Sequence, residues 1–301
     1  MHNSFACSFF ITLMSDTVLL HPHFITLPGN IEIAYTDDGT GEETLLFVHG
    51  LSSNLLIWSP NISAFKSHYR CIAIDLPGHG ASSKEKYPYT IDFFLDILQQ
   101  FLKELEIKSC VLVGHSMGGQ ISIAAAVKFP NLFSRLILAA PAGFEQFTRI
   151  ERNLMSGYYL QHVLQSPLYK KMISSVIKAR DLPKPFGSPN MAEKYGFFPG
   201  DVPKLKSEQY LGLCIKGMLE HSAHFLLHRI TQPTLVIFGK EDRLIPNRMF
   251  HHMTTEDVAR EGASHIHNCK LIMFDDCGHY VQHEKPEEFN VAVYQFLNPE
   301  E

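Results

Sequence analysis

Residues 113–120 read VGHSMGGQ, and this short stretch decides how the rest of the chain is interpreted. Ser116 stands between Gly114 and Gly118, and a third glycine follows at position 119. Glycine loses more backbone entropy on folding than any other residue, so three of them around one hydroxyl need a reason. The spacing G-x-S-x-G is typical of a tight turn that presents a serine hydroxyl between a strand and a helix.

The sequence on either side supplies both expected neighbours. Residues 110–116 (CVLVGHS) form a largely apolar run, as in strands that are buried on both faces of a parallel sheet. Residues 117–129 are small and rich in alanine, which favours a helix packed closely on that sheet. A lone G-x-S-x-G is a weak signal, but a strand before it and a helix after it make the signal much stronger.

Similar strand and helix patterns alternate along most of the chain. The alternation predicts an α/β fold with a predominantly parallel sheet. Segments on either side of Gly29-Asn30 indicate an antiparallel hairpin. Thr90 is a suitable N-cap for the helix that follows it. The predicted strands are 24–28, 31–36, 44–50, 71–80, 110–116, 135–141, 234–242 and 270–279, and the main predicted helices are 90–107, 117–129 and 286–297.

Residues 144–229 break this alternation. They contain no strong strand candidate, only helix-like pieces separated by prolines and glycines, which predicts a helical insertion between two strands of the sheet. We expect most of its large apolar side chains to pack within the insertion and a minority to line a substrate cleft. These side chains are Phe144, Phe147, Leu154, Met155, Tyr158, Tyr159, Phe197 and Phe198.

A serine hydroxyl is a poor nucleophile unless a base takes its proton. His279 follows the last predicted strand, which places it at the same carboxyl edge of the sheet as Ser116. His283, four residues later, is the nearest rival and is interpreted as a surface or first-turn residue.

The imidazole needs a carboxylate on its other nitrogen. Asp242 ends the strand TLVIFGKED at the same edge, and the neighbouring Glu241 would point away if Asp242 points inward. The strand RLILAAPAG offers no carboxylate before Glu145. The order Ser116…Asp242…His279 is the one expected of an α/β-hydrolase fold.

Two peptide N–H groups are predicted to bind the oxyanion of the transition state. One belongs to Met117, the residue after the serine. The other comes from the loop FVHGLSSN (47–54), where Leu51 is the first choice and Ser52 the alternative. The His49-Gly50 pair in this loop is also consistent with nothing more than a tight turn.

Taken together, these motifs make the chain resemble the α/β-hydrolase superfamily over nearly its whole length. The resemblance implies an eight-stranded, mostly parallel sheet with flanking helices and a Ser116–His279–Asp242 triad. It also implies a helical cap, or lid, inserted after the sixth strand, and makes Asp75 a structural residue of its turn rather than a rival acid. It rests on FVHGLSSN, DLPGHGASS, VGHSMGG, IFGKEDRLIP and DDCGHYVQHEKPEEF, in the order and spacing of the family.

The domain boundaries follow from this resemblance. Residues 14–143 and 230–301 form the hydrolase core, and residues 144–229 form the cap. Residues 1–13 are a loose N-terminal extension, since they lack the positive region of a secretory signal and Met14 is an equally plausible start.

The function implied is a serine hydrolase that cleaves a carboxylic ester of an apolar or aromatic acyl group, as bacterial carboxylesterases do. Hydrolases that cleave C–C bonds in meta-cleavage products share much of the pattern. They usually carry Asn before the serine and a more glycine-rich oxyanion loop, whereas this chain has His115 and LSSN. A cofactor-free perhydrolase or haloperoxidase, and a receptor that retains the triad, are the remaining alternatives.

Composition and charge exclude other classes of partner. A net charge of −5 indicates neither a nucleic-acid partner nor an anionic membrane surface. The six cysteines are scattered without a CxxC pair, which favours a reducing, cytoplasmic compartment, and no apolar run is long enough to span a membrane.

The predicted reaction needs neither a cofactor nor a metal. His221, His224 and His228 are expected along one helical face, where they could bind a metal ion. Neither an HExxH pattern nor a matching carboxylate accompanies them, so no metal site is predicted.

Overall fold

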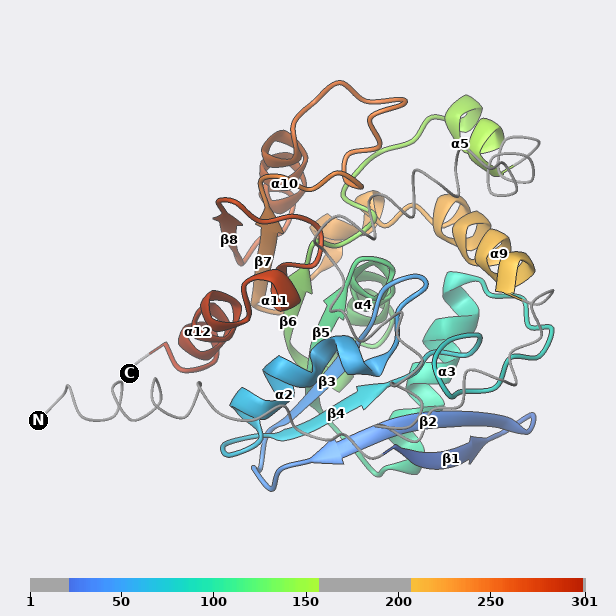
Figure 1. Ribbon diagram of the computed structural model, residues 1–301, viewed down its shortest axis with the longest axis vertical. Coiled ribbons are helices and arrows are strands. Elements are labelled where there is room, and N and C mark those ends of the chain that lie inside the picture. The colour runs from blue at the N-terminus through green and yellow to red at the C-terminus, as the bar shows by residue number, and fades with distance from the viewer. Residues whose placement is uncertain (1–21, 157–206, 300–301) are drawn as a thin grey trace, which may run out of the picture.

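The protein is described from a computed structural model, in which residues 22–156 and 207–299 are described. Within these residues, eight strands form one sheet in the order β1-β2-β4-β3-β5-β6-β7-β8 (Figure 1). β1 pairs antiparallel with β2, and β2 with β4, while all other neighbours are parallel. The predicted mostly parallel α/β fold is therefore confirmed. The strands are β1 His23–Leu27, β2 Ile31–Asp38, β3 Thr44–Val48, β4 Arg70–Ile74, β5 Cys110–His115, β6 Phe133–Ala139, β7 Thr234–Gly239 and β8 Cys269–Phe274.

Helices cover both faces of the sheet and bury it from either side. α3 (Ile91–Glu104), α4 (Met117–Lys128) and α10 (Thr255–Ser264) pack on one face, together with side chains such as Leu46 and Leu112. α2 (Ser59–Phe65), α11 (Val281–Glu284) and α12 (Pro286–Leu297) pack on the other, against Phe47 and Val113. Since alternate side chains of the same strand enter the two cores, the central strands are uninterrupted apolar runs.

The strands that carry the site end earlier than the sequence patterns predict. β4 ends at Ile74, β7 at Gly239 and β8 at Phe274, so Asp242 and His279 lie in the loops beyond the sheet. Thr90 is the N-cap of α3, as predicted, and its hydroxyl accepts a hydrogen bond of 3.2 Å from the Phe93 N–H.

The described part of the insertion between β6 and β7 is helical, as predicted. It comprises α5 (Arg149–Ser156), α9 (Ser207–Glu220) and the 3-10 helix η6 (His224–Arg229). α5 and α9 contact each other, and Figure 1 shows them together at the upper right of the molecule. The predicted extension 1–13 and the aromatic residues Tyr158, Tyr159, Phe197 and Phe198 lie outside the described residues.

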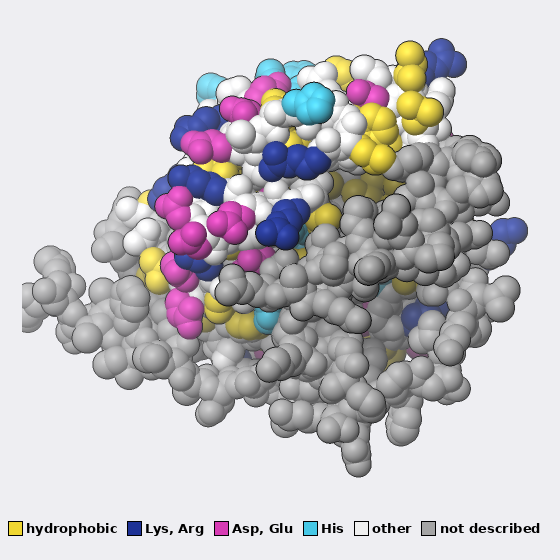
Figure 2. Space-filling view, turned by 45° about the horizontal axis from the view of Figure 1, so that its top comes forward, with side chains coloured by type: hydrophobic (Ala, Val, Ile, Leu, Met, Phe, Trp, Pro, Cys, Tyr) yellow, Lys and Arg dark blue, Asp and Glu magenta, His cyan; other side chains and the backbone are white. Residues whose placement is uncertain are grey.

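The surface carries charges of both signs. Figure 2 shows acidic and basic side chains interspersed rather than gathered by sign. Two exposed pairs illustrate this mixture, Lys240 with Asp275 at 2.7 Å and Arg260 with Glu256 at 2.5 Å. In the portion of the chain that the structure covers, no helix is both long and apolar enough to cross a membrane.

Candidate active site

Ser116 occupies a sharp turn between β5 and α4. Its backbone lies at φ +54° and ψ −117°, a conformation that a residue with a side chain rarely adopts. Hydrogen bonds hold this strained peptide in place: the Ser116 N–H donates to the Ala139 carbonyl, and the Ser116 carbonyl accepts from the N–H groups of Gln120 and Ala142, all at 3.0 Å. Strain of this kind persists only where the surroundings determine the backbone, and it is concentrated at functional sites.

The glycines around Ser116 are explained by close contacts with the backbone. A Cβ at Gly118 would lie 2.6 Å from the His49 carbonyl oxygen, and one at Gly114 would lie 2.5 Å from the carbonyl oxygen of Gly118. A Cβ at Gly50 would approach the Ser116 Cβ to 2.9 Å. These contacts bring the loop after β3 directly against the serine.

His279 and Asp242 meet in a buried pair. His279 Nδ1 donates to Asp242 Oδ2 at 2.7 Å, and the other carboxylate oxygen, Oδ1, accepts from the N–H groups of Leu244 at 2.7 Å and Ile245 at 3.0 Å. Asp242 is fully buried. Since a carboxylate only accepts, the proton of a neutral His279 lies on Nδ1, and Nε2 is left with a lone pair that can receive a proton.

The rival residues make other contacts. Glu241 is exposed, as predicted. Glu145 accepts hydrogen bonds from the Asn247 N–H, at 2.6 Å, and from His251 Nδ1, rather than from His279. Burial raises the pKa of Glu145 above its usual range.

Asp75 has the structural position that the resemblance implies. Its Oδ1 accepts from the Leu55 N–H at 2.7 Å and its Oδ2 from the Ala81 N–H at 2.8 Å, so it ties two loops together behind the site. His283, the rival base, lies in α11, where burial lowers its pKa.

The residues that carry the two predicted oxyanion donors, Met117 and Leu51, lie near the serine. Met117 is the first residue of α4, so its N–H has no partner within the helix. Leu51 follows Gly50, whose backbone lies against Ser116, and its side chain lines the same pocket as the serine. His49 secures this turn, because its Nδ1 donates to the Gly50 carbonyl at 2.7 Å and its Nε2 accepts from the Leu76 N–H at 3.1 Å.

One pocket, of about 200 Å³, contains Ser116 and His279. Four of the large apolar residues predicted for the insertion lie among the described residues. Phe147 and Met155 line the pocket, whereas Phe144 belongs to the core and Leu154 is exposed. The remaining lining is mostly apolar: Leu51, Ala142, Gly143, Ile215, Met218, Leu219, Ala223, Leu244 and Ile245.

Several polar residues of the pocket have no signal in the sequence. Gln120, on α4, donates to the carbonyls of Met218 at 2.8 Å and His221 at 2.7 Å, and so fastens the end of α9 to the core. Arg152 and Glu145 also line the pocket. These contacts join segments roughly a hundred residues apart, so no local pattern indicates them.

His115, the residue before the serine, supports the loop that carries His279. Its Nε2 donates to the His279 carbonyl at 3.0 Å, and the two rings lie 4.9 Å apart. Burial lowers the pKa of His115 well below its usual value, so this ring is neutral.

The expectation that His221, His224 and His228 share one helical face is wrong. α9 ends at Glu220, and η6 begins only at His224. His221 therefore lies in the short non-helical segment between two separate helices. His224 instead approaches Glu261 and His265.

Comparisons with known proteins agree with this fold. A family model described as the alpha/beta hydrolase fold matches residues 43–286. An uncharacterized hydrolase of Bacillus subtilis, YugF, is 29% identical over 264 residues, which are 85% of this chain and 90% of that protein.

Two further relatives have more specific descriptions. A 2-hydroxy-6-oxononadienedioate/2-hydroxy-6-oxononatrienedioate hydrolase of Paraburkholderia phymatum is 28% identical, over 94% of this chain and 99% of that protein. The solved structure of a thermophilic esterase from Thermogutta terrifontis is similar with a TM-score of 0.70 and 25% identity, covering 93% of this chain and 98% of that one.

Proposed function

Because the chain belongs to the α/β-hydrolase family, we propose that it is a serine hydrolase that cleaves a carboxylic ester through an acyl-enzyme on Ser116. The observation that carries this proposal is the buried His279–Asp242 pair, which lies at the pocket that Ser116 also lines. An imidazole held in this tautomer is suited to remove the proton of a serine hydroxyl.

The reaction proceeds in two steps. The Ser116 oxygen attacks the ester carbonyl while its proton passes to His279 Nε2, and the N–H groups of Leu51 and Met117 bind the oxyanion. The intermediate collapses, the C–O bond of the ester breaks, and the alcohol leaves with the proton from His279. Water, deprotonated by the same histidine, then attacks the acyl-enzyme and releases the acid and free Ser116.

The lining of the pocket supports an apolar acyl group. Its walls come from the core loops and from α5 and α9, with side chains such as Phe147, Met155 and Met218. Residues 144–229 would then act as a helical cap over the core formed by 14–143 and 230–301. A volume of about 200 Å³ favours a compact acyl group over a long chain.

Cleavage of a C–C bond in a meta-cleavage product is the second candidate. Two observations favour it: the relative from Paraburkholderia phymatum is named for a dioate substrate, and Arg152 lines the pocket, where a guanidinium could bind a substrate carboxylate. His115 and the LSSN loop, which differ from the usual residues of that class, favour the ester.

Initial rates on p-nitrophenyl esters from acetate to palmitate, measured beside Ser116→Ala, test the proposal. We expect turnover that depends on Ser116 and is highest for a short or medium acyl chain. Equal rates in Ser116→Ala would contradict the assignment of the nucleophile. Negligible rates on every ester, together with Ser116-dependent cleavage of a ring-opened dienone, would establish the second candidate instead.

A further inference from the structure

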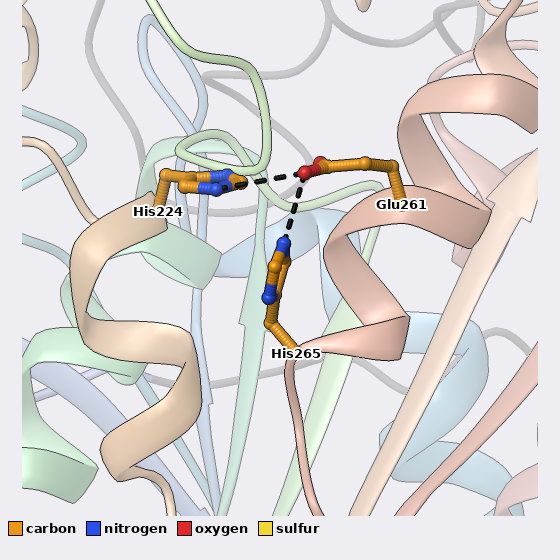
Figure 3. Close-up of side chains that lie close together, drawn as sticks. All are labelled: His224, Glu261 and His265. Carbon is orange, nitrogen blue, oxygen red and sulfur yellow. Dashed lines mark hydrogen bonds and ion pairs between the residues drawn. The ribbon is translucent and has the colours of Figure 1, made fainter.

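A second group of side chains capable of chemistry lies outside the pocket. His224, at the start of η6, meets Glu261 and His265 at the C-terminal end of α10 (Figure 3). Glu261 Oε1 lies 2.9 Å from His265 Nε2 and 3.6 Å from His224 Nε2. Each of the three residues offers one ligand atom within 4.8 Å of the other two.

Burial and one hydrogen bond fix the orientation of the His224 ring. Its ring is 6% exposed, and its Nδ1 donates to the Phe144 carbonyl at 2.9 Å. A neutral His224 therefore carries its lone pair on Nε2, the nitrogen that faces the Glu261 carboxylate. Two acceptors that face each other attract only when a cation, either a proton or a metal ion, lies between them.

The hydrogen bond from His224 Nδ1 to the Phe144 carbonyl is of the kind that metal-binding histidines make. In such sites the second ring nitrogen donates to a carbonyl or carboxylate, which fixes the tautomer and aims the other nitrogen at the metal. Phe144 is itself fully buried against Phe238 and α10, so the carbonyl that orients His224 belongs to a rigid part of the core.

The distances from the Glu261 carboxylate to the two histidine nitrogens suit a tetrahedral ion. Metal–ligand distances of about 2.0–2.1 Å require ligand atoms roughly 3.3 Å apart, and Glu261 Oε1 lies 2.9 Å from His265 Nε2 and 3.6 Å from His224 Nε2. Glu261 and His265 are 44% and 45% exposed, so their side chains can adjust around an ion while His224 stays fixed. Imidazole together with one carboxylate favours a transition metal over Mg²⁺ or Ca²⁺.

We propose that His224, Glu261 and His265 bind a divalent transition-metal ion such as Zn²⁺, with water in the fourth position. The ion would tie η6, where the insertion returns to the core, to the end of α10. Ser222 and Ala223, which immediately precede His224, line the pocket, so the tie would hold one pocket wall in place.

The N-terminal end of α10 is hydrogen-bonded to the loop that carries Asp242. The hydroxyl of Thr255, in its first turn, donates to the carbonyls of Asp242 at 3.2 Å and Ile245 at 2.9 Å. A metal at the C-terminal end would therefore link the pocket wall, through one helix, to the loop of Asp242. Its role is structural, since none of its ligands lines the pocket.

A Co²⁺ titration of the full chain, purified without a histidine tag, tests the proposal. Co²⁺ reports a tetrahedral site by its visible absorption, and calorimetry gives the stoichiometry with Zn²⁺. Glu261→Gln and His265→Ala remove exposed ligands, so both variants are expected to fold. His267→Ala is the matched control, because His267 is an exposed histidine two residues from the site.

We expect one equivalent of metal to bind, with at least about tenfold weaker affinity in each ligand variant and unchanged affinity in His267→Ala. Saturating Zn²⁺ should raise the melting temperature of the parent by about 5 °C, and the same Zn²⁺ concentration should raise that of His265→Ala by less. No binding, or binding that all three variants retain equally, would overturn the proposal.

Discussion

At the level of single residues, the site depends on how Asp242 is held. Its carboxylate accepts three hydrogen bonds in a fully buried position, two from backbone N–H groups and one from His279. The backbone bonds fix the carboxylate, and the carboxylate in turn fixes the imidazole. In the proposed mechanism, the aspartate would orient the base and stabilise the imidazolium that forms during the reaction.

Replacing Asp242 by Asn should therefore lower kcat by about 10⁴-fold, because the amide can present its N–H to His279 and stabilise the wrong tautomer. Steady-state kinetics on the best ester measures this effect. Glu241→Gln, the same change at the exposed neighbouring acid, is the control and should retain the parent rate. A small loss in Asp242→Asn would remove the aspartate from the mechanism.

Two substitutions of Leu51 separate the contribution of its side chain to kcat from that of its peptide N–H. Leu51→Ala keeps the N–H and should change kcat only modestly, mainly through the apolar lining of the pocket. Leu51→Pro removes the N–H and should lower kcat by about 10²–10³-fold, the usual effect of losing one oxyanion donor. Melting curves of both variants establish whether they fold, and equal rates in the two would assign the second donor to Ser52.

At the level of elements, the turn between β5 and α4 depends on backbone contacts that leave no room for a side chain. Gly118 of α4 lies against the carbonyls of Val48 and His49 at the end of β3. Because these carbonyls belong to the backbone, they cannot rotate away as a flexible side chain would.

Gly118→Ala should therefore lower the free energy of unfolding by about 1–3 kcal/mol, the usual cost of overpacking. Gly212→Ala in α9 is the matched control, since nothing lies within 4 Å of the position its Cβ would take. There the helix propensity of alanine should raise stability by up to about 1 kcal/mol. Urea unfolding of the two variants compares them, and an equal effect would mean that α4 shifts freely on the sheet.

The sequence predicts the strands better than it predicts their ends and the smaller helices. The hairpin signal at Gly29-Asn30 identifies β1 and β2, and apolar runs identify the other strands of the described sheet. β4, β7 and β8 nevertheless end earlier than predicted, at the start of the loops that carry Asp75, Asp242 and His279.

The helices predicted from the sequence do not include α10, whose buried face is made largely of small residues such as Ala259, Gly262 and Ala263. The capping box formed by Thr254 and Asp257 was the available signal.

The residues of the candidate site are predictable from the sequence only where they closely follow a strand. Ser116, Asp242 and His279 each come shortly after a strand of the parallel sheet, so topology brings them to one edge. Their roles remain predictions until they are tested by substitution. Gln120, Glu145 and Arg152 enter the pocket through contacts between distant segments, and the metal-binding proposal joins η6 to α10 in the same way.

At the level of the whole molecule, buried histidines should make stability depend on pH. Burial lowers the pKa of His49 to about 3 and that of His79 to about 4, and it lowers that of His115 well below its usual value. Between these values and the unfolded pKa of about 6.5, the unfolded chain binds more protons than the folded one. Stability is therefore fully present above about pH 6.5 and falls as the pH is lowered.

Each of these histidines contributes about 1.4 kcal/mol per pH unit in that range. Burial also raises the pKa of Asp75, to about 6, and that of Glu145, and these two acids act in the opposite direction. The net slope should still be a loss of at least about 1.4 kcal/mol per unit below pH 6. Urea unfolding from pH 7.5 to 5 measures this slope, and His115→Asn should reduce it by the share of one histidine. A stability that does not change with pH would contradict the burial of these rings as neutral groups.

If Ser116 is an activated nucleophile, it should react covalently with a fluorophosphonate. The full chain would be treated with a fluorophosphonate, and the adduct located by intact mass and peptide mapping. We predict one adduct per chain, on Ser116, formed rapidly in the parent, much more slowly in Asp242→Asn and not at all in Ser116→Ala. Labelling at the same rate in Ser116→Ala, or no labelling of a folded parent, would contradict the account.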